Sequence, residues 1–113
     1  MMGDARAQYR VGETYANTKQ AQKWYCLSAL QGYVPAQAAL GDLYSGNRKI
    51  SDQSQNAKPK LNFIAAYMWY TVAAASGHDE AFNRRQTLGN MMAPNDVVAA
   101  KKNAARWTQQ RCN

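Results

Sequence analysis

The sequence predicts an all-α protein in which short antiparallel helix hairpins stack on one another, and three observations lead to this prediction. Alanine, the strongest helix former, occurs twenty times in 113 residues. The chain has three prolines and lacks the alternating runs of Val, Ile and Thr that are typical of strands. The pattern A-x-x-W-Y-x-x-x-A-x-x-G occurs twice, at 21–32 and at 66–77. A chain of this length holds one core, so residues 1–113 are predicted to form a single domain.

A second pattern, A-Q-x-x-[L/V]-G-x-x-Y, alternates with the first. It occurs at 7–15 and at 36–44, and Ala81 begins a divergent third copy. Offsets of three, four, seven and eight residues place the patterned side chains on one face of a helix. Because one helix cannot bury such a face by itself, consecutive helices are expected to pack as hairpins and stack. In this arrangement the Trp-Tyr pairs are core residues and not a sugar-binding platform.

Local chemistry predicts where several helices begin and end. Gly32 and Gly77 follow the two A-x-x-W-Y helices, at the position of a left-handed helix cap. Pro35 suits the first turn of the next helix, since its missing N–H is not needed there. Asp79 and Glu80 suit the positive end of the helix dipole.

The connections are predicted from composition. A short turn is expected at 17–20, and a polar, basic insert at about 45–61 is expected to be an unpacked loop. Pro94 then opens a C-terminal capping helix at about 94–109. The longest apolar run, 63–75, is shorter than the roughly 20 residues that span a bilayer.

Two cysteines, Cys26 and Cys112, are too few for a disulfide framework or a zinc site, and their number favours two unpaired thiols. The N-terminus shows no signal peptide, which favours a cytosolic protein or a mature chain from which a leader has been trimmed. The single histidine, His78, has no catalytic partner in the sequence, and no phosphate loop or metal-ligand spacing occurs. The sequence therefore predicts a non-enzymatic protein with no catalytic residue, no cofactor, no metal and no small-molecule substrate.

The alternation AQxxLGxxY and AxxWYxxAAxxG is similar to the Sel1-like repeat family, relatives of the tetratricopeptide repeat. The resemblance extends from Ala5 to about Trp107. It implies a short right-handed α-solenoid of about two and a half repeats and roughly six helices. Arg85 and Gln86 replace the Leu-Gly pair of the third copy, which suggests a terminal capping repeat. The resemblance also implies a bacterial adaptor protein. If a leader peptide was trimmed from the chain, the expected location is the cell envelope, the periplasm or the outside of the cell. If there was no leader, the expected location is the cytoplasm.

A helical solenoid presents a concave face to a peptide or protein segment, and the first helix of each pair is expected to line it. Positions three and six residues after the repeat alanine lie outside the packing pattern and are candidates for partner binding. These candidates are Arg10, Ala39, Arg84, Glu13, Asp42 and Thr87. With arginines at both edges, the expected occupant is a peptide with acidic groups.

The net charge of +7 supports an alternative partner, a polyanion such as nucleic acid or an anionic membrane surface. The candidates for this contact lie in the insert: Arg48, Lys49, Lys58 and Lys60. The basic residues are spread over loop, helix and tail, and the sequence has no nucleic-acid-binding motif, so binding of a peptide is the favoured prediction. Salt dependence distinguishes the two, because polyanion binding weakens steeply as salt rises.

Overall fold

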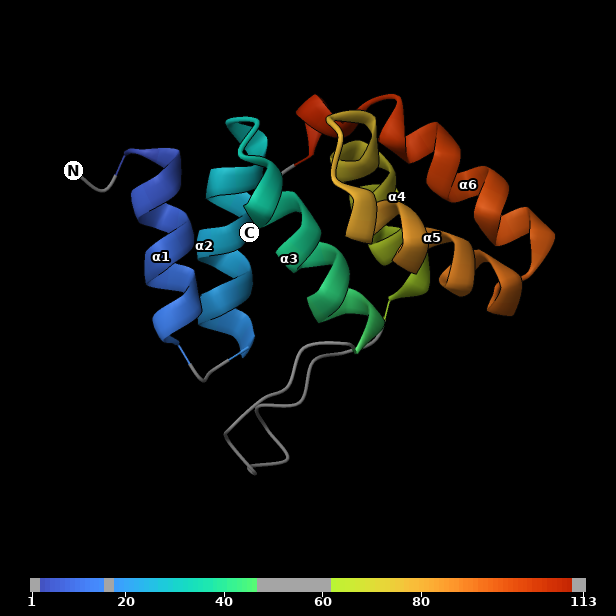
Figure 1. The fold of residues 1–113 in the computed structure, drawn as a ribbon, viewed down its shortest axis with the longest axis horizontal. Helices are drawn as coiled ribbons and strands as arrows, with labels where there is room; N and C mark the ends of the chain where they lie inside the picture. Colours follow the sequence, from blue (N-terminus) through green and yellow to red (C-terminus); the bar gives the residue numbers. More distant parts are fainter. Residues whose placement is uncertain (1–2, 16–17, 47–61, 111–113) are drawn as a thin grey trace.

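The computed structural model describes residues 3–15, 18–46 and 62–110, and these residues form six α-helices and no strand. The helices are α1 (Ala5–Thr14), α2 (Thr18–Leu30), α3 (Val34–Ser45), α4 (Phe63–Ala75), α5 (Asp79–Met91) and α6 (Pro94–Ala104), with a 3-10 turn η2 (Trp107–Gln109) after them. From α1 to α5 each helix packs against the next, and α6 packs on α4 (Figure 1). The predicted all-α class is therefore confirmed.

The predicted helix caps are present. Gly32 and Gly77 have φ angles of 89° and 94°, a conformation that residues with a Cβ rarely adopt. After Gly32, the N–H of Tyr33 donates to the carbonyl of Ser28 at 3.4 Å. After Gly77, the N–H of His78 donates to the carbonyl of Ala73 at 3.2 Å. This is the hydrogen bond of a Schellman cap. Pro35 lies in the first turn of α3 and Asp79 in the first turn of α5, as the sequence predicts.

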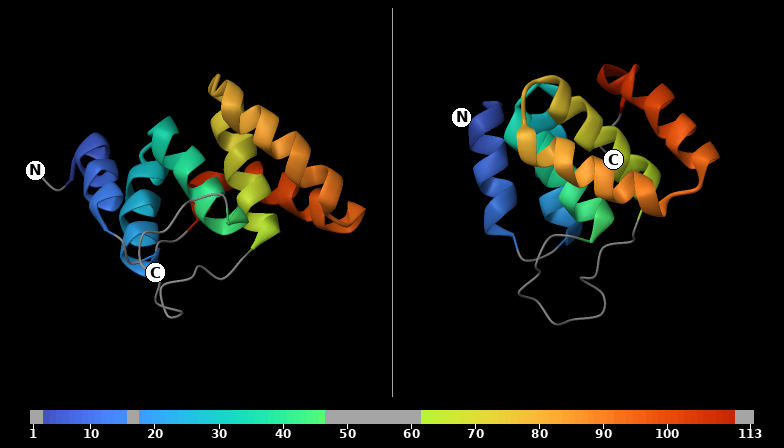
Figure 2. Two further views of the ribbon diagram at one scale, coloured as in Figure 1. Left: turned by 60° about the horizontal axis from the view of Figure 1, so that its bottom comes forward. Right: turned by 45° about the vertical axis from the view of Figure 1, so that its right-hand side comes forward.

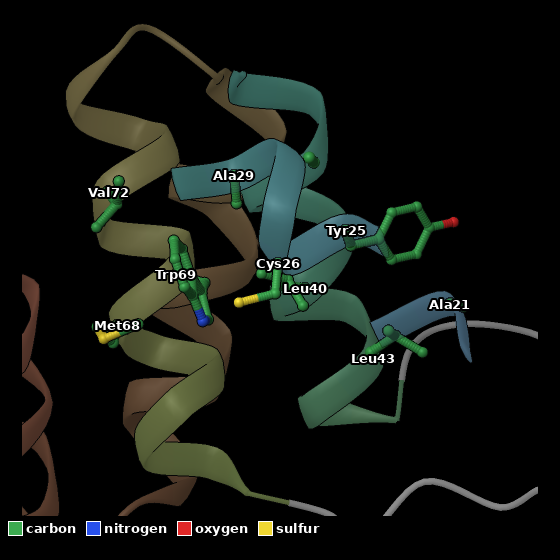
Figure 3. Close-up of a cluster of buried hydrophobic side chains, with 10 residues drawn as sticks. Ala21, Tyr25, Cys26, Ala29, Leu40, Leu43, Met68, Trp69 and Val72 are labelled. Atoms are coloured by element: carbon green, nitrogen blue, oxygen red, sulfur yellow. The ribbon is translucent and has the colours of Figure 1, made fainter. Parts of the chain in front are cut away.

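A first buried cluster joins α2, α3 and α4, and Trp69 lies inside it. Figure 3 shows the indole pointing from α4 toward Cys26 and Ala29 on α2 and Leu40 on α3. Trp69 is 3% exposed, so its predicted burial is confirmed. Trp24 holds the same position in the earlier copy of the pattern but is only half-buried and lies outside the cluster.

A second buried cluster joins α3, α4, α5 and α6. Because α4 contributes to both clusters, it is the central helix of the described fold, with α3, α5 and α6 packed around it (Figure 2). No residue of α4 is charged, which agrees with its central position. The members of the second cluster are Ala38, Ala66, Tyr67, Tyr70, Ala73, Ala81, Leu88 and Ala100.

The two copies of the repeat share one close contact between a glycine and a tyrosine ring. A Cβ added to Gly12 on α1 would lie 2.8 Å from the ring of Tyr25 on α2. A Cβ added to Gly41 on α3 would lie closer still to the ring of Tyr70 on α4. Each glycine belongs to the A-Q pattern and each tyrosine to the following A-x-x-W-Y pattern, so both patterns are explained by the same helix–helix approach.

The ends of the insert meet at the close of α3 and the start of α4. Gly46, with a φ of 84°, caps α3, and the N–H of Asn62 donates to the carbonyl of Tyr44 at 2.9 Å. The side chain of Asn62 then accepts from the N–H of Ala65 and begins α4. The predicted loop itself, from 47 to 61, lies outside the described residues.

Two predicted boundaries are wrong. The turn predicted at 17–20 is shorter, because α2 begins at Thr18 and includes Lys19 and Gln20, which are good helix formers. The capping helix predicted at 94–109 ends at Ala104. There the chain turns so that the ring of Trp107 packs edge-on against Trp69, with 6.4 Å between ring centroids. Partial burial of the Trp107 indole against the first buried cluster replaces the last helical turns.

Cys26 is 8% exposed and disulfide-bonded, so the prediction of an unpaired thiol at this position is wrong. The other cysteine of the chain, Cys112, lies outside the described residues. Cysteine count and spacing carried no signal for the bond, because the folding of the chain and not its local sequence decides which thiols meet.

Substitution of Gly41 by alanine is expected to destabilise the fold, although alanine normally strengthens a helix by about 1 kcal/mol. The added methyl group would overlap the buried ring of Tyr70, and overpacking of this kind costs about 1–3 kcal/mol. Chemical denaturation measures the change. Gly89→Ala is the matched control, since its Cβ would lie 3.1 Å from Tyr67 and the effect should be smaller. A Gly41→Ala chain that is more stable than the native chain by about 1 kcal/mol, the full helix-propensity gain, would contradict the close contact.

Reduction of the disulfide is expected to lower the thermal stability. Loss of a native disulfide from a small domain costs about 2–5 kcal/mol, and Cys26 is buried among core side chains. Calorimetry with and without a phosphine reductant measures the shift in melting temperature. The Cys26→Ser variant should melt lower than the native chain and should not respond to the reductant. If the reductant leaves the melting temperature of the native chain unchanged, the disulfide does not stabilise the fold.

Candidate functional site

A cavity of about 310 Å³ lies where α5 meets α3 and α4, and we call it the α3–α5 pocket. It combines polar groups from three helices with an apolar floor. The lining residues are Ser45, Tyr70, Glu80, Asn83, Arg84, Thr87, Leu88 and Met91.

A hydrogen-bonded network around Asp42 forms the polar side of the pocket. The carboxylate of Asp42 accepts from Nη1 of Arg84, at 2.7 Å to Oδ1 and 2.6 Å to Oδ2. It also accepts from the hydroxyl of Tyr70 at 2.7 Å, and that hydroxyl lies 2.9 Å from the hydroxyl of Ser45. Arg84 pairs with Glu80 through its other terminal nitrogen. The network therefore ties α3, α4 and α5 together.

Arg84 remains charged in this setting. Its partial burial by itself lowers the pKa of the guanidinium, but the adjacent Asp42 carboxylate, with Glu80, raises the pKa overall above its ordinary value. The network then contains two carboxylates and one guanidinium, a net charge of −1. This sign is opposite to the net charge of +7 of the whole chain.

The apolar side of the pocket comes from the second half of α5. Leu88 is 3% exposed and forms part of the floor, whereas Met91 is 65% exposed. An unbranched, flexible thioether side chain adapts to differently shaped apolar partners. The exposed side chains of Asn83 and Thr87 complete the lining.

The local sequence of α5 brings these side chains to one face. His78 begins the helix, where its Nδ1 accepts the N–H of Ala81 at 3.0 Å. Glu80 therefore lies in the first turn, and Arg84, Thr87 and Met91 follow at intervals of four, three and four residues. Such intervals place side chains on the same side of a helix.

Three of the six groove residues predicted from the sequence meet at this pocket. Thr87 and Arg84 line it, and Asp42 holds Arg84 from α3. The sequence predicted that Asp42 and Arg84 are open to a partner, whereas the structure pairs them with each other. An arginine already held by two carboxylates is a poor site for an acidic peptide.

The other three predicted groove residues lie elsewhere. Arg10 lines a separate cavity of about 300 Å³ beside Asp4 and Arg6 on α1, and Ala39 packs against the first buried cluster. Glu13 is exposed and lies beside Tyr9; burial, and then this carboxylate, raises the pKa of Tyr9 to about 12.

The basic insert residues predicted as an alternative site, Arg48, Lys49, Lys58 and Lys60, lie outside the described residues. Sequence reasoning missed several pocket residues. The repeat pattern predicts a core position for Tyr70, and its hydroxyl nevertheless reaches the pocket. Glu80 suits the positive end of the helix dipole, and its spacing of four residues from Arg84 is in addition a signal for an ion pair along one helix. Met91 belongs to neither repeat pattern and gave no signal.

Within the described ranges, no group of three or more His, Cys, Asp and Glu side chains could hold a metal ion. In the same part of the chain, every helix is too short or too polar to cross a membrane. No protein-family model matches the chain, and no curated protein matches it. Its function is therefore inferred from the fold and the pocket alone.

Removal of Asp42 is expected to destabilise the chain, because Arg84 and the hydroxyl of Tyr70 would lose their shared partner in a partly buried site. Loss of such a partner costs about 1–3 kcal/mol, so Asp42→Ala should lower the free energy of unfolding by that amount. A double-mutant cycle with Arg84→Ala should show a coupling energy of about 0.5–3 kcal/mol. Asp96→Ala, an exposed acid in the first turn of α6, is the control and should change stability by about 0.5 kcal/mol. A coupling energy of zero would contradict the pairing.

Proposed function

We propose that this chain is a non-enzymatic protein-interaction module, a short α-solenoid of Sel1-like repeats, and that it binds a peptide segment of another protein in the α3–α5 pocket. The observation that carries the proposal is the pocket itself, an open cavity between two helices of the A-Q type with an exposed methionine at its side. Exposed, adaptable apolar side chains beside a cavity are typical of surfaces that anchor partner side chains.

The size of the pocket favours a peptide over a larger ligand. Cavities that enclose drug-sized ligands measure about 300–1,000 Å³, and the α3–α5 pocket lies at the lower limit with about 310 Å³. It suits one anchoring side chain of an extended or helical segment. The Asp42 network supports this use, because it fixes Arg84 and Tyr70 before a partner arrives and so lowers the entropy cost of binding.

The repeat assignment is supported by the equivalence of the two hairpins. Both use a glycine from the A-Q pattern against a tyrosine from the next pattern, and both A-x-x-W-Y helices end in the same glycine cap. The disulfide at Cys26 favours a location in the cell envelope or outside the cell, since disulfides persist in oxidising compartments.

Blocking the pocket tests the proposal. Peptides selected from a random phage-displayed library on the native chain are synthesised with a fluorescent label, and their affinities are measured by anisotropy. Thr87→Arg places a bulky side chain at the pocket lining and should weaken the selected peptides by about tenfold or more, as expected for loss of a contact of at least about 1.4 kcal/mol. Thr108→Arg makes the same exposed substitution in η2 and should have no effect.

Equal affinity of the two variants would overturn the proposal. Both should keep the melting temperature of the native chain, because both threonines are exposed. A short duplex DNA and anionic vesicles serve as probes for the alternative. Binding of either probe that is unchanged by Thr87→Arg and falls steeply between about 50 and 200 mM salt would favour polyanion recognition over peptide binding.

A further inference from the structure

The charge around the α3–α5 pocket differs in sign from the charge of the chain. The network on its polar side holds two carboxylates, Asp42 and Glu80, and the guanidinium of Arg84, which leaves a net charge of −1. The whole chain has a net charge of +7. Overall charge alone would therefore select acidic partners, whereas the net charge of the Asp42 network favours a cation.

The two arginines of α5 do not offer a site for an acidic group. Arg84 is held by Asp42 and Glu80. The guanidinium of Arg85 lies over the ring of Phe82, 4.9 Å from its centroid, and does not line the pocket. An anion that approached Arg84 would meet the Asp42 and Glu80 carboxylates on either side of it.

Two features instead attract a cation. Glu80 is the most open member of the network, with 63% of its side chain exposed, so it can pair with an incoming charge while it still accepts from Arg84. The pocket also lies at the C-terminal end of α3, where Ser45 is the last helical residue. This end of a helix carries partial negative charge, and α3 has no basic residue in its last turn, whereas the positive end of α5 is already offset by Asp79 and Glu80 in its own first turn.

From this arrangement we infer that the peptide bound in the α3–α5 pocket is a basic one: an apolar side chain lies against Leu88 and Met91, and a neighbouring Lys or Arg pairs with Glu80. The inference rests on the proposed function and adds the chemistry of the partner to it. It also replaces the acidic peptide that the sequence predicted, because the network leaves Glu80 and not Arg84 as its exposed charge.

Matched peptides test the sign of the preference. Short acetylated peptides of sequence Ser-Gly-Leu-X-Gly-Ser, with Lys, Gln or Glu at X, are titrated into isotope-labelled protein. Nuclear magnetic resonance follows the backbone amides of Thr87, Leu88 and Met91, so only binding at the pocket is counted. The Lys peptide should bind most tightly and the Glu peptide least tightly.

A conservative variant isolates the contribution of Glu80. Glu80→Gln keeps an acceptor for Arg84 but removes the charge, and it should weaken the Lys peptide by about two- to fivefold more than it weakens the Gln peptide, the range of an exposed ion pair. Asp96→Asn removes an exposed acid at the equivalent place in the first turn of α6 and should leave all three affinities unchanged.

The outcomes separate this inference from the function on which it rests. If the Glu peptide binds as tightly as the Lys peptide or more tightly, while Thr87→Arg blocks both, the basic preference is overturned and the peptide-binding pocket stands. An equal loss of Lys-peptide affinity in Asp96→Asn and Glu80→Gln also overturns the preference, since it would reflect net charge only. If no peptide shifts the pocket amides, or Thr87→Arg leaves their binding intact, both proposals fail.

Discussion

The close approach of a glycine to a tyrosine ring determines how the helices of this protein fit together. Gly12 faces Tyr25 and Gly41 faces Tyr70, each with too little room for a methyl group. Helix backbones come this near only where one of them lacks a side chain, so the glycines set the spacing within each hairpin. The spacing in turn allows α4 to be enclosed by α3, α5 and α6 and to carry Trp69 into the first buried cluster.

Tyr70 connects this packing to the pocket. Its ring fills the space left by Gly41, and its hydroxyl emerges beside Ser45 to donate to Asp42. Asp42 is thereby oriented to receive Arg84 from the next helix. The polar side of the α3–α5 pocket is thus built on the same contact that sets the hairpin, and a rigid scaffold of this kind favours a preformed binding site.

The C-terminal part of the chain adds a second constraint. Trp107 packs on Trp69, and α6 packs on α4. The last described helix and turn therefore contribute side chains to the core. The disulfide-bonded Cys26 lies in the same buried cluster. Packing and covalent linkage therefore act on the same region, around Trp69.

The repeated Ala, Gly, Trp and Tyr positions, read from the sequence alone, determined the helical class, the caps at Gly32 and Gly77 and the burial of Trp69, because these depend on periodicity and backbone conformation within single helices. The early end of α6, the disulfide at Cys26 and the pairing of Asp42 with Arg84 were decided only by tertiary structure. The pairing of Asp42 with Arg84 and the packing of Trp107 on Trp69 each join residues far apart in the chain, and a local pattern carries no information on which distant side chains meet. The same reason explains why the sequence predicted that Asp42 and Arg84 are open to a partner, whereas the folded chain pairs them with each other.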